Sequence, residues 1–147
     1  MANKSPEKIV VIELKKFFKS QPDWFDVHVI EAKANFNEKA GRYMNGAVAP
    51  GYPDMSGSDK FGYALFIEVK APGKRATLRP EQYLFLKRKI EMNAFACCVD
   101  SVAMFKDLYK NWLELELPQR QQYLLSQIKL PKKLKQILED DSPLFPD

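Results

Sequence analysis

The stretch GYPDMSGSDKFGYALFIEVK, residues 51–70, decides the fold that we expect of this chain. Its last six residues predict a β-strand, in which successive side chains point to opposite faces of a sheet. Glu68 and Lys70 therefore share one face with Phe66, while the aliphatic residues of the strand take the other face. Charged groups at the end of a buried strand are costly unless a ligand compensates them, and Asp54 lies in the Gly/Pro turn upstream.

The length and composition are those of one compact globular domain. The chain has 147 residues, of which 46% are hydrophobic, so it can bury a full core without disulfides. Its two cysteines, Cys97 and Cys98, are adjacent in an apolar run, which indicates core packing in a reducing compartment. The sequence has neither a secretory h-region nor a run of about 18 apolar residues, so we expect a cytoplasmic protein with no membrane partner. A net charge of +4 does not by itself indicate nucleic-acid binding.

The periodicity of the apolar residues predicts the element order α, β, β, β, α, β, α. Ser5 and Pro6 mark the start of the first helix, and Pro80 marks the start of the next. The expected elements are a helix to about residue 20, a strand near 27–30, a hairpin ending in strand 63–70, a helix from 80 to about 92, a strand at 95–99, a helix at 101–115 and short helices at 119–128 and 131–138. Residues 35–53 predict a long functional loop. This order indicates an α/β fold with a mixed sheet and helices on both faces.

The charged residues of the 63–70 strand fit the hydrolysis of a phosphodiester. That reaction needs a metal ion to polarise the phosphate and generate hydroxide near neutral pH, and Mg²⁺ prefers oxygen ligands. Asp54 and Glu68 can supply two carboxylates at the end of the sheet, and the backbone carbonyl of Val69 can complete the protein ligands. Lys70 would then contact the attacking water or the scissile phosphate as a point charge.

Each candidate residue has an ordinary explanation when it is taken alone. A Glu-x-Lys tripeptide on a strand is most often a solvated ion pair, and Asp54 after a proline is most often a turn former. Gln82 would ordinarily be exposed on its helix, and Lys74 and Arg75 would be surface charges. His28, the sole histidine, is more readily a strand residue than a ligand. The occurrence of these residues together, in this order and spacing, indicates a catalytic site more specifically than any one of them does alone.

The order and spacing of these motifs resemble the VRR-NUC domains of the PD-(D/E)xK nuclease superfamily. The matching pieces are GYPD at 51–54, FIEVK at 66–70, APGKRATLRPEQ at 71–82 and AFACCVDS at 94–101. The resemblance covers roughly residues 5–113. It implies a restriction-endonuclease-like α/β core within a nuclease domain at 1–113, and it leaves a helical extension and tail at 114–147.

The resemblance also implies a set of site residues. In this family two carboxylates and a backbone carbonyl bind Mg²⁺ or Mn²⁺, a lysine assists catalysis and a helix glutamine lies in the site. The corresponding residues here are Asp54, Glu68, the carbonyl of Val69, Lys70 and Gln82. The family's first-helix glutamate is expected at Glu7, which is in phase with the core-facing stripe, while Glu13 is out of phase and stays the alternative.

The function implied by the resemblance is a metal-dependent DNA endonuclease that prefers branched DNA such as a Holliday junction. Lys39 and Arg42 in the long loop, with Lys74 and Arg75 after the strand, would flank the metal site and hold a DNA backbone. Because one site of this size cuts one strand, symmetric cleavage of a four-way junction would require a homodimer. The alternatives are a non-catalytic DNA-binding module that retains the fold and, more remotely, an interaction domain with no nucleic-acid role.

Overall fold

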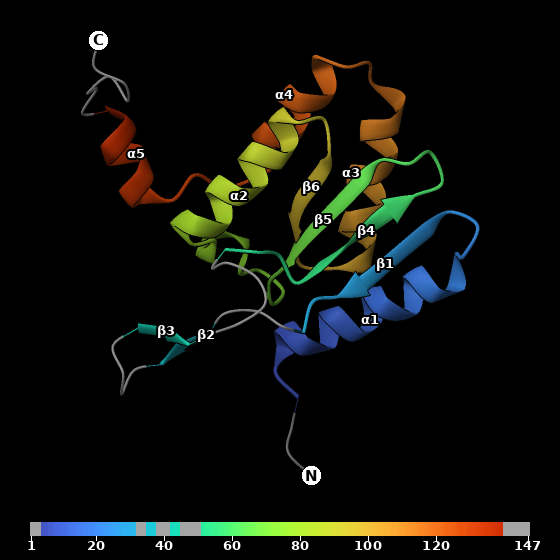
Figure 1. Cartoon of the computed structure of the whole chain (residues 1–147), viewed down its shortest axis with the longest axis horizontal. Coiled ribbons are helices and arrows are strands. Elements are labelled where there is room, and N and C mark those ends of the chain that lie inside the picture. The colour runs from blue at the N-terminus through green and yellow to red at the C-terminus, as the bar shows by residue number, and fades with distance from the viewer. Residues whose placement is uncertain (1–3, 32–34, 38–41, 45–50, 140–147) are drawn as a thin grey trace.

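The chain folds into a four-stranded sheet flanked by helices (Figure 1). The computed structural model describes residues 4–31, 35–37, 42–44 and 51–139. Its elements are α1 (Pro6–Ser20), β1 (Phe25–Val29), β2 (Asn35–Asn37), β3 (Arg42–Met44), β4 (Met55–Asp59), β5 (Ala64–Val69), the 3₁₀ turn η1 (Arg75–Thr77), α2 (Pro80–Glu91), β6 (Phe95–Val99), α3 (Val102–Glu114), α4 (Gln119–Ser126) and α5 (Lys132–Glu139). No helix within these ranges combines the length and the hydropathy of a membrane span.

The main sheet has the strand order β1, β4, β5, β6, and its last pair alone is parallel. Strands β5 and β6 are joined through α2, the kind of crossover that a parallel pair requires. This arrangement confirms the expected α/β fold with a mixed sheet flanked by helices. The parallel register places Glu68 opposite Cys98 and Val69 opposite Val99. The carboxyl ends of two parallel strands therefore meet at the edge where Lys70 follows β5.

Two short strands lie within the segment that the sequence predicted to be one long loop. β2 and β3 pair in antiparallel fashion, with Asn35 opposite Met44, and form a separate two-stranded sheet. The prediction of an uninterrupted loop was therefore wrong in this respect. Strands of three residues are too short for an alternating apolar pattern to be recognised.

Helix α1 begins where the sequence predicts. Ser5 Oγ accepts a hydrogen bond from the backbone N–H of Lys8 at 3.2 Å, and Pro6 occupies the first turn. The side chains of its buried stripe are Val10, Leu14 and Phe18. This stripe fixes the helix against the sheet and determines where the first turn, which carries Glu7, meets the end of β5.

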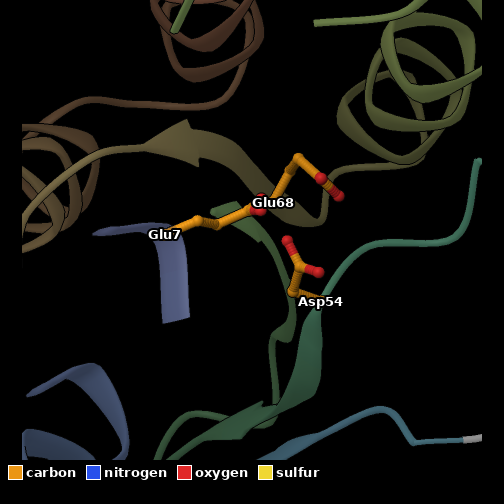
Figure 2. A group of neighbouring side chains, drawn as sticks. All are labelled: Glu7, Asp54 and Glu68. Carbon is orange, nitrogen blue, oxygen red and sulfur yellow. The ribbon is translucent and has the colours of Figure 1, made fainter. Parts of the chain in front are cut away.

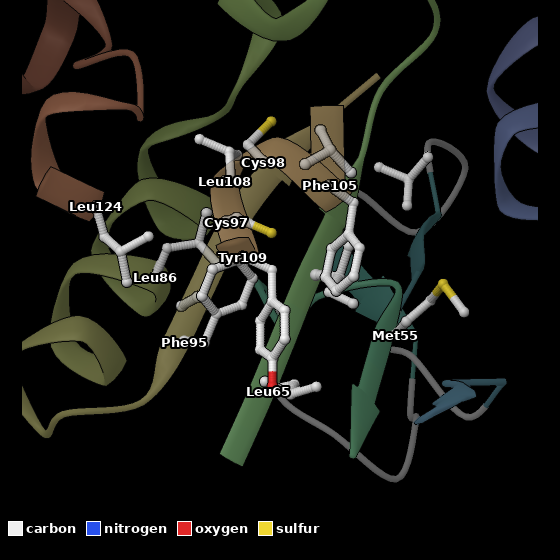
Figure 3. Close-up of a cluster of buried hydrophobic side chains, with 14 of the residues drawn as sticks. Met55, Leu65, Leu86, Phe95, Cys97, Cys98, Phe105, Leu108, Tyr109 and Leu124 are labelled. Atoms are coloured by element: carbon white, nitrogen blue, oxygen red, sulfur yellow. The ribbon is translucent and has the colours of Figure 1, made fainter. Parts of the chain in front are cut away.

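The two faces of β5 are covered by different helices, as the predicted alternation requires. The residues of the fully buried face are Leu65, Ile67 and Val69. They belong to the main core (Figure 3), in which Phe95 of β6 packs against Phe105 of α3 with ring centroids 5.7 Å apart. Phe66 and Glu68 point to the other face, where the ring of Phe66 lies 5.5 Å from that of Phe85 on α2.

Helix α4 belongs to the same core as the elements before it. Leu124 and Ile128 are buried in the main cluster. Arg120 Nε donates to the carbonyls of Trp112 and Leu115, which lie at the end of α3. The Trp112 carbonyl also accepts a hydrogen bond from the Leu115 N–H at 3.2 Å. The guanidinium adds a second donor at this helix end and links α4 to α3. The hydrophobic core therefore continues past residue 113 into α4.

Candidate metal and catalytic site

Three carboxylates from distant parts of the chain converge at the end of the sheet (Figure 2). Glu7 extends from the first turn of α1, Asp54 from the turn before β4 and Glu68 from β5. One oxygen of each lies within 4.8 Å of the other two. Neighbouring ligands of a six-coordinate Mg²⁺ are roughly 3 Å apart and opposite ligands about 4 Å apart, since each metal–oxygen distance is about 2.1 Å. The donor set therefore fits a hard divalent cation after small side-chain movements.

Asp54 is held in position by main-chain contacts. Its Oδ2 accepts a hydrogen bond from the Val69 N–H at 2.8 Å, and its own carbonyl accepts one from the Ile30 N–H at 2.8 Å. Because the N–H and the carbonyl of a strand residue point to the same side, the Val69 carbonyl, the expected third ligand, faces Asp54 as well. The preceding turn is fixed at Gly51, where φ is +90° and a Cβ would come within 2.6 Å of the Glu81 carbonyl oxygen. Only glycine fits this close approach.

Gln82 connects the buried carboxylate of β5 to the lysine. Its Nε2 donates to Glu68 Oε1 at 3.0 Å, and its Oε1 accepts hydrogen bonds from Lys70 Nζ at 3.1 Å and from the Arg79 N–H at 3.0 Å. The last of these bonds is the N3-to-N-cap contact of a capping box, so the start of α2 orients the amide. Glu68 and Gln82 are 2% and 4% exposed. A residue that would ordinarily lie on a helix surface is thus buried between two charged groups.

Three acidic side chains lie close together in the cluster. They gather beside the ammonium of Lys70, whose Nζ lies 3.9 Å from Glu68 Oε1 and whose side chain is 12% exposed. Two like charges 4 Å apart repel by about 4 kcal/mol at an effective dielectric constant of about 20. A divalent cation held between the three carboxylates would offset this repulsion. The carboxylates therefore suit a metal ion.

The cysteines beside the cluster are neutral packing groups, as the sequence predicted. Both thiols are free and buried. Burial raises the pKa of Cys98 to about 12, and the nearby charge of Glu68 adds to this shift. The pKa of Cys97 is also raised well above its usual value, mainly by burial. Neither thiol is a thiolate ligand near neutral pH, so the carboxylates dominate the chemistry of the site.

The structure distinguishes the two glutamates that the first helix offers. Glu7 joins the carboxylate cluster. Glu13 is exposed and lines a neighbouring hollow of about 310 Å³, together with Pro72 and Asp100. The helical phase that favoured Glu7 over Glu13 thus agrees with the observed placement.

The four basic residues expected to contact DNA differ in placement. Lys74 is exposed in the connector after β5. Arg75 is occupied within the fold: its Nε donates to the Cys98 carbonyl at 2.9 Å, and its Nη2 donates to the carbonyl of Gln127. Arg42 lies on β3, and Lys39 lies outside the described residues. Of this set, Lys74 has the placement of a surface phosphate contact.

Sequence reasoning missed a buried polar contact at the opposite end of the hairpin. Asp59, which is 7% exposed, accepts hydrogen bonds from the N–H groups of Phe61 and Tyr63 through Oδ1, both at 2.9 Å. Its Oδ2 accepts one from the Tyr109 hydroxyl at 2.8 Å. Burial and this hydrogen bond raise the pKa of Tyr109. An aspartate at the start of a Gly-containing turn was a visible signal for the first two bonds, but its partner on α3 was not.

Comparisons with protein-family models, with curated proteins and with solved structures gave no match to this chain. The features that bear on its function are the geometry of the carboxylate cluster and the sequence motifs that form it.

Proposed function

We propose that this protein is a metal-dependent DNA endonuclease that uses Mg²⁺ or Mn²⁺ and has a nuclease core of the PD-(D/E)xK type. The observation that carries the proposal is the convergence of Glu7, Asp54 and Glu68 within 4.8 Å, with Lys70 joined to Glu68 through Gln82. Carboxylates that bind a hard cation, next to a lysine, form a site suited to a substrate whose negative charge increases in the transition state.

Each residue of the site would have a separate role in the reaction. Asp54, Glu68 and the Val69 carbonyl would hold the metal, and Glu7 would complete its acidic surroundings. When bound, the metal polarises the phosphate and lowers the pKa of water. Lys70 would donate a hydrogen bond to the oxygen that gains negative charge at the phosphate. Gln82 would keep the ammonium directed at that position, because the amide is itself fixed by the start of α2.

A non-catalytic DNA-binding module is the alternative, and the burial of the charges disfavours it. Phosphate binding alone needs exposed basic residues. A carboxylate that is 2% exposed beside a lysine that is 12% exposed costs several kcal/mol in desolvation. A module that only binds DNA has no use for such a group, whereas metal-assisted hydrolysis does. The proposal also includes a preference for branched DNA and a homodimer. These two parts are supported by the resemblance of the sequence motifs to the nuclease family.

The test is a cleavage assay on linear duplex, flapped and four-way DNA, with Mg²⁺, with Mn²⁺ and with EDTA. The proposal expects strand cleavage in either metal and none in EDTA, and faster cleavage of the branched substrates. Glu7→Gln should reduce cleavage, and Glu13→Gln on the same helix is the matched control because it lies outside the cluster. Equal cleavage in metal and in EDTA would contradict the proposal, and binding without cleavage would favour the alternative.

A further inference from the structure

Three aromatic rings and a lysine adjoin the carboxylate cluster on the α2 side of the sheet. The ring of Tyr52 lies 4.8 Å from that of Phe85, and the ring of Phe66 lies 5.5 Å from Phe85 and 6.3 Å from Tyr52. The ammonium of Lys89 stands 5.1 Å from the Phe66 ring centroid and 5.5 Å from that of Phe85. We call these four residues the aromatic platform.

The aromatic platform is built into the same segments as the candidate site. Tyr52 precedes Asp54 by two residues in the fixed turn. Phe66 precedes Glu68 by two residues on the same face of β5, which corresponds to about 6–7 Å along a strand. Phe85 follows Gln82 by three residues, close to one turn of α2. The three rings therefore belong to the same turn, strand and helix that carry Asp54, Glu68 and Gln82.

The platform differs from the main aromatic core in its exposure. Phe95 and Phe105 in the main core are completely buried, with 0% exposure. Tyr52, Phe66 and Phe85 are each half-buried. The platform therefore reaches the surface, although its rings pack against one another.

The position of the platform relative to the site is rigid. Gly51 lies against the first turn of α2 with no room for a side chain, so the turn that carries Tyr52 and Asp54 packs directly on α2. Phe66 and Phe85 lie on a strand and a helix of the main fold. A ligand group on the rings would be held at a constant distance from the metal ligands, which is what a substrate-positioning contact needs.

We propose that the aromatic platform binds one unpaired base next to the scissile phosphate. Aromatic side chains stack on bases without regard to sequence, and a nearby cation adds an attraction to the phosphate of the same nucleotide. Bases within a duplex are already stacked on each other, so a base can use the platform only where the strand is single or the pairing is broken. The inference rests on the proposed nuclease function and adds that the substrate carries an unpaired nucleotide beside the cut.

The test uses binding in EDTA, which does not depend on cleavage. The probes are flapped DNAs in which a single abasic residue is placed at successive positions of the unpaired strand, measured by fluorescence anisotropy. Wild-type protein should lose about 10-fold in affinity at one position, because one base–aromatic contact supports a loss of this size. Phe85→Leu should lose affinity for the intact flap and show no further loss with the abasic probe at that position, since the two changes remove the same contact.

Phe61→Leu is the matched control. Phe61 is 55% exposed in the β4–β5 turn and has the ammonium of Lys60 5.5 Å from its ring centroid, so it resembles Phe85 in its cation contact but lies at the other end of the hairpin. This variant should keep the wild-type abasic effect. Melting curves would identify a variant that fails to fold, and Tyr52→Leu would then replace Phe85→Leu.

Two results would overturn the inference: equal affinity of the wild type for every abasic probe, or an unchanged abasic effect in Phe85→Leu. Metal-dependent cleavage with no base dependence would reject the aromatic platform and keep the proposed function. Base-dependent binding with no cleavage in either metal would reject the nuclease and keep the stacking contact.

Discussion

Lys70 Nζ lies 3.9 Å from Glu68 Oε1, too far for a direct hydrogen bond, and the two groups are joined through the amide of Gln82. The amide accepts from the ammonium and donates to the carboxylate, so it fixes both. In the proposed reaction, Gln82 is thus a positioning residue for the lysine, and its burial is explained by this double contact.

Gln82→Ala should reduce the single-turnover cleavage rate by about 10- to 100-fold, because a displaced catalytic group costs that much. DNA affinity in EDTA should stay the same, since the residue is 4% exposed and reaches no surface. The free energy of unfolding of this variant should also fall by about 1–3 kcal/mol, because the buried partners of the amide lose hydrogen bonds. Gln122→Ala, at an exposed position on α4, is the control. A wild-type cleavage rate in Gln82→Ala would refute the positioning role.

Lys70→Ala should lower the single-turnover rate by about 10²-fold or more while metal binding is retained. One hydrogen-bond donor directed at developing charge commonly raises the rate by a factor of that size. Metal binding should remain because the three carboxylates that would hold the metal are unchanged. Calorimetric titration with Mn²⁺ and cleavage kinetics on the same preparation would measure both quantities. Loss of metal binding together with loss of the folded state would show that Lys70 is structural.

Lys74 and Arg75 should respond differently to substitution although they are neighbours. Lys74→Ala removes an exposed charge, so we expect unchanged stability and a salt slope for DNA binding that is shallower by about 0.9. Arg75→Ala removes hydrogen bonds to the carbonyls of Cys98 and Gln127, so we expect a loss of about 2–4 kcal/mol in unfolding free energy. Urea titrations and binding at several salt concentrations would separate the two effects. Equal stability of both variants would contradict the role of Arg75 in the fold.

Cys98 should make the fold less stable at alkaline pH. Its pKa in the folded state is about 12, above the ordinary value of 9.0, so the unfolded chain releases the proton first as pH rises. The neutral thiol's contribution to the unfolding free energy is fully present below about pH 9 and is lost between pH 9 and 12. At pH 10 the expected loss is about 1 kcal/mol. Urea titrations should therefore show that the free energy of unfolding falls less between pH 8 and pH 10 in Cys98→Ala than in the wild type. An identical decline would mean that the thiol titrates normally in the fold.

Short-range patterns predicted the parts of the site that depend on one element. Period-two alternation placed Glu68 and Phe66 on the face opposite Ile67, and helical phase favoured Glu7 over Glu13. Both patterns follow from the geometry of a single strand or helix.

Contacts between distant segments were not predictable in the same way. Gln82 was read as an exposed helix residue if taken alone, and Arg75 as a surface charge or a DNA contact. Their buried hydrogen bonds depend on how α2 and α4 approach the sheet, and no local periodicity encodes that approach. The contact between Asp59 and Tyr109, fifty residues apart along the chain, was missed for the same reason.

The most direct test of the central claim is the single-turnover cleavage of labelled flapped DNA in Mn²⁺ by the wild type and by Glu68→Gln. The substitution keeps the shape of the side chain but removes the acidic group of a proposed metal ligand, which is 2% exposed in the carboxylate cluster. Loss of that acidic group should abolish metal-dependent cleavage while thermal unfolding still shows a folded protein, and Glu13→Gln should cleave like the wild type. Cleavage by Glu68→Gln at the wild-type rate would contradict the assignment of this site.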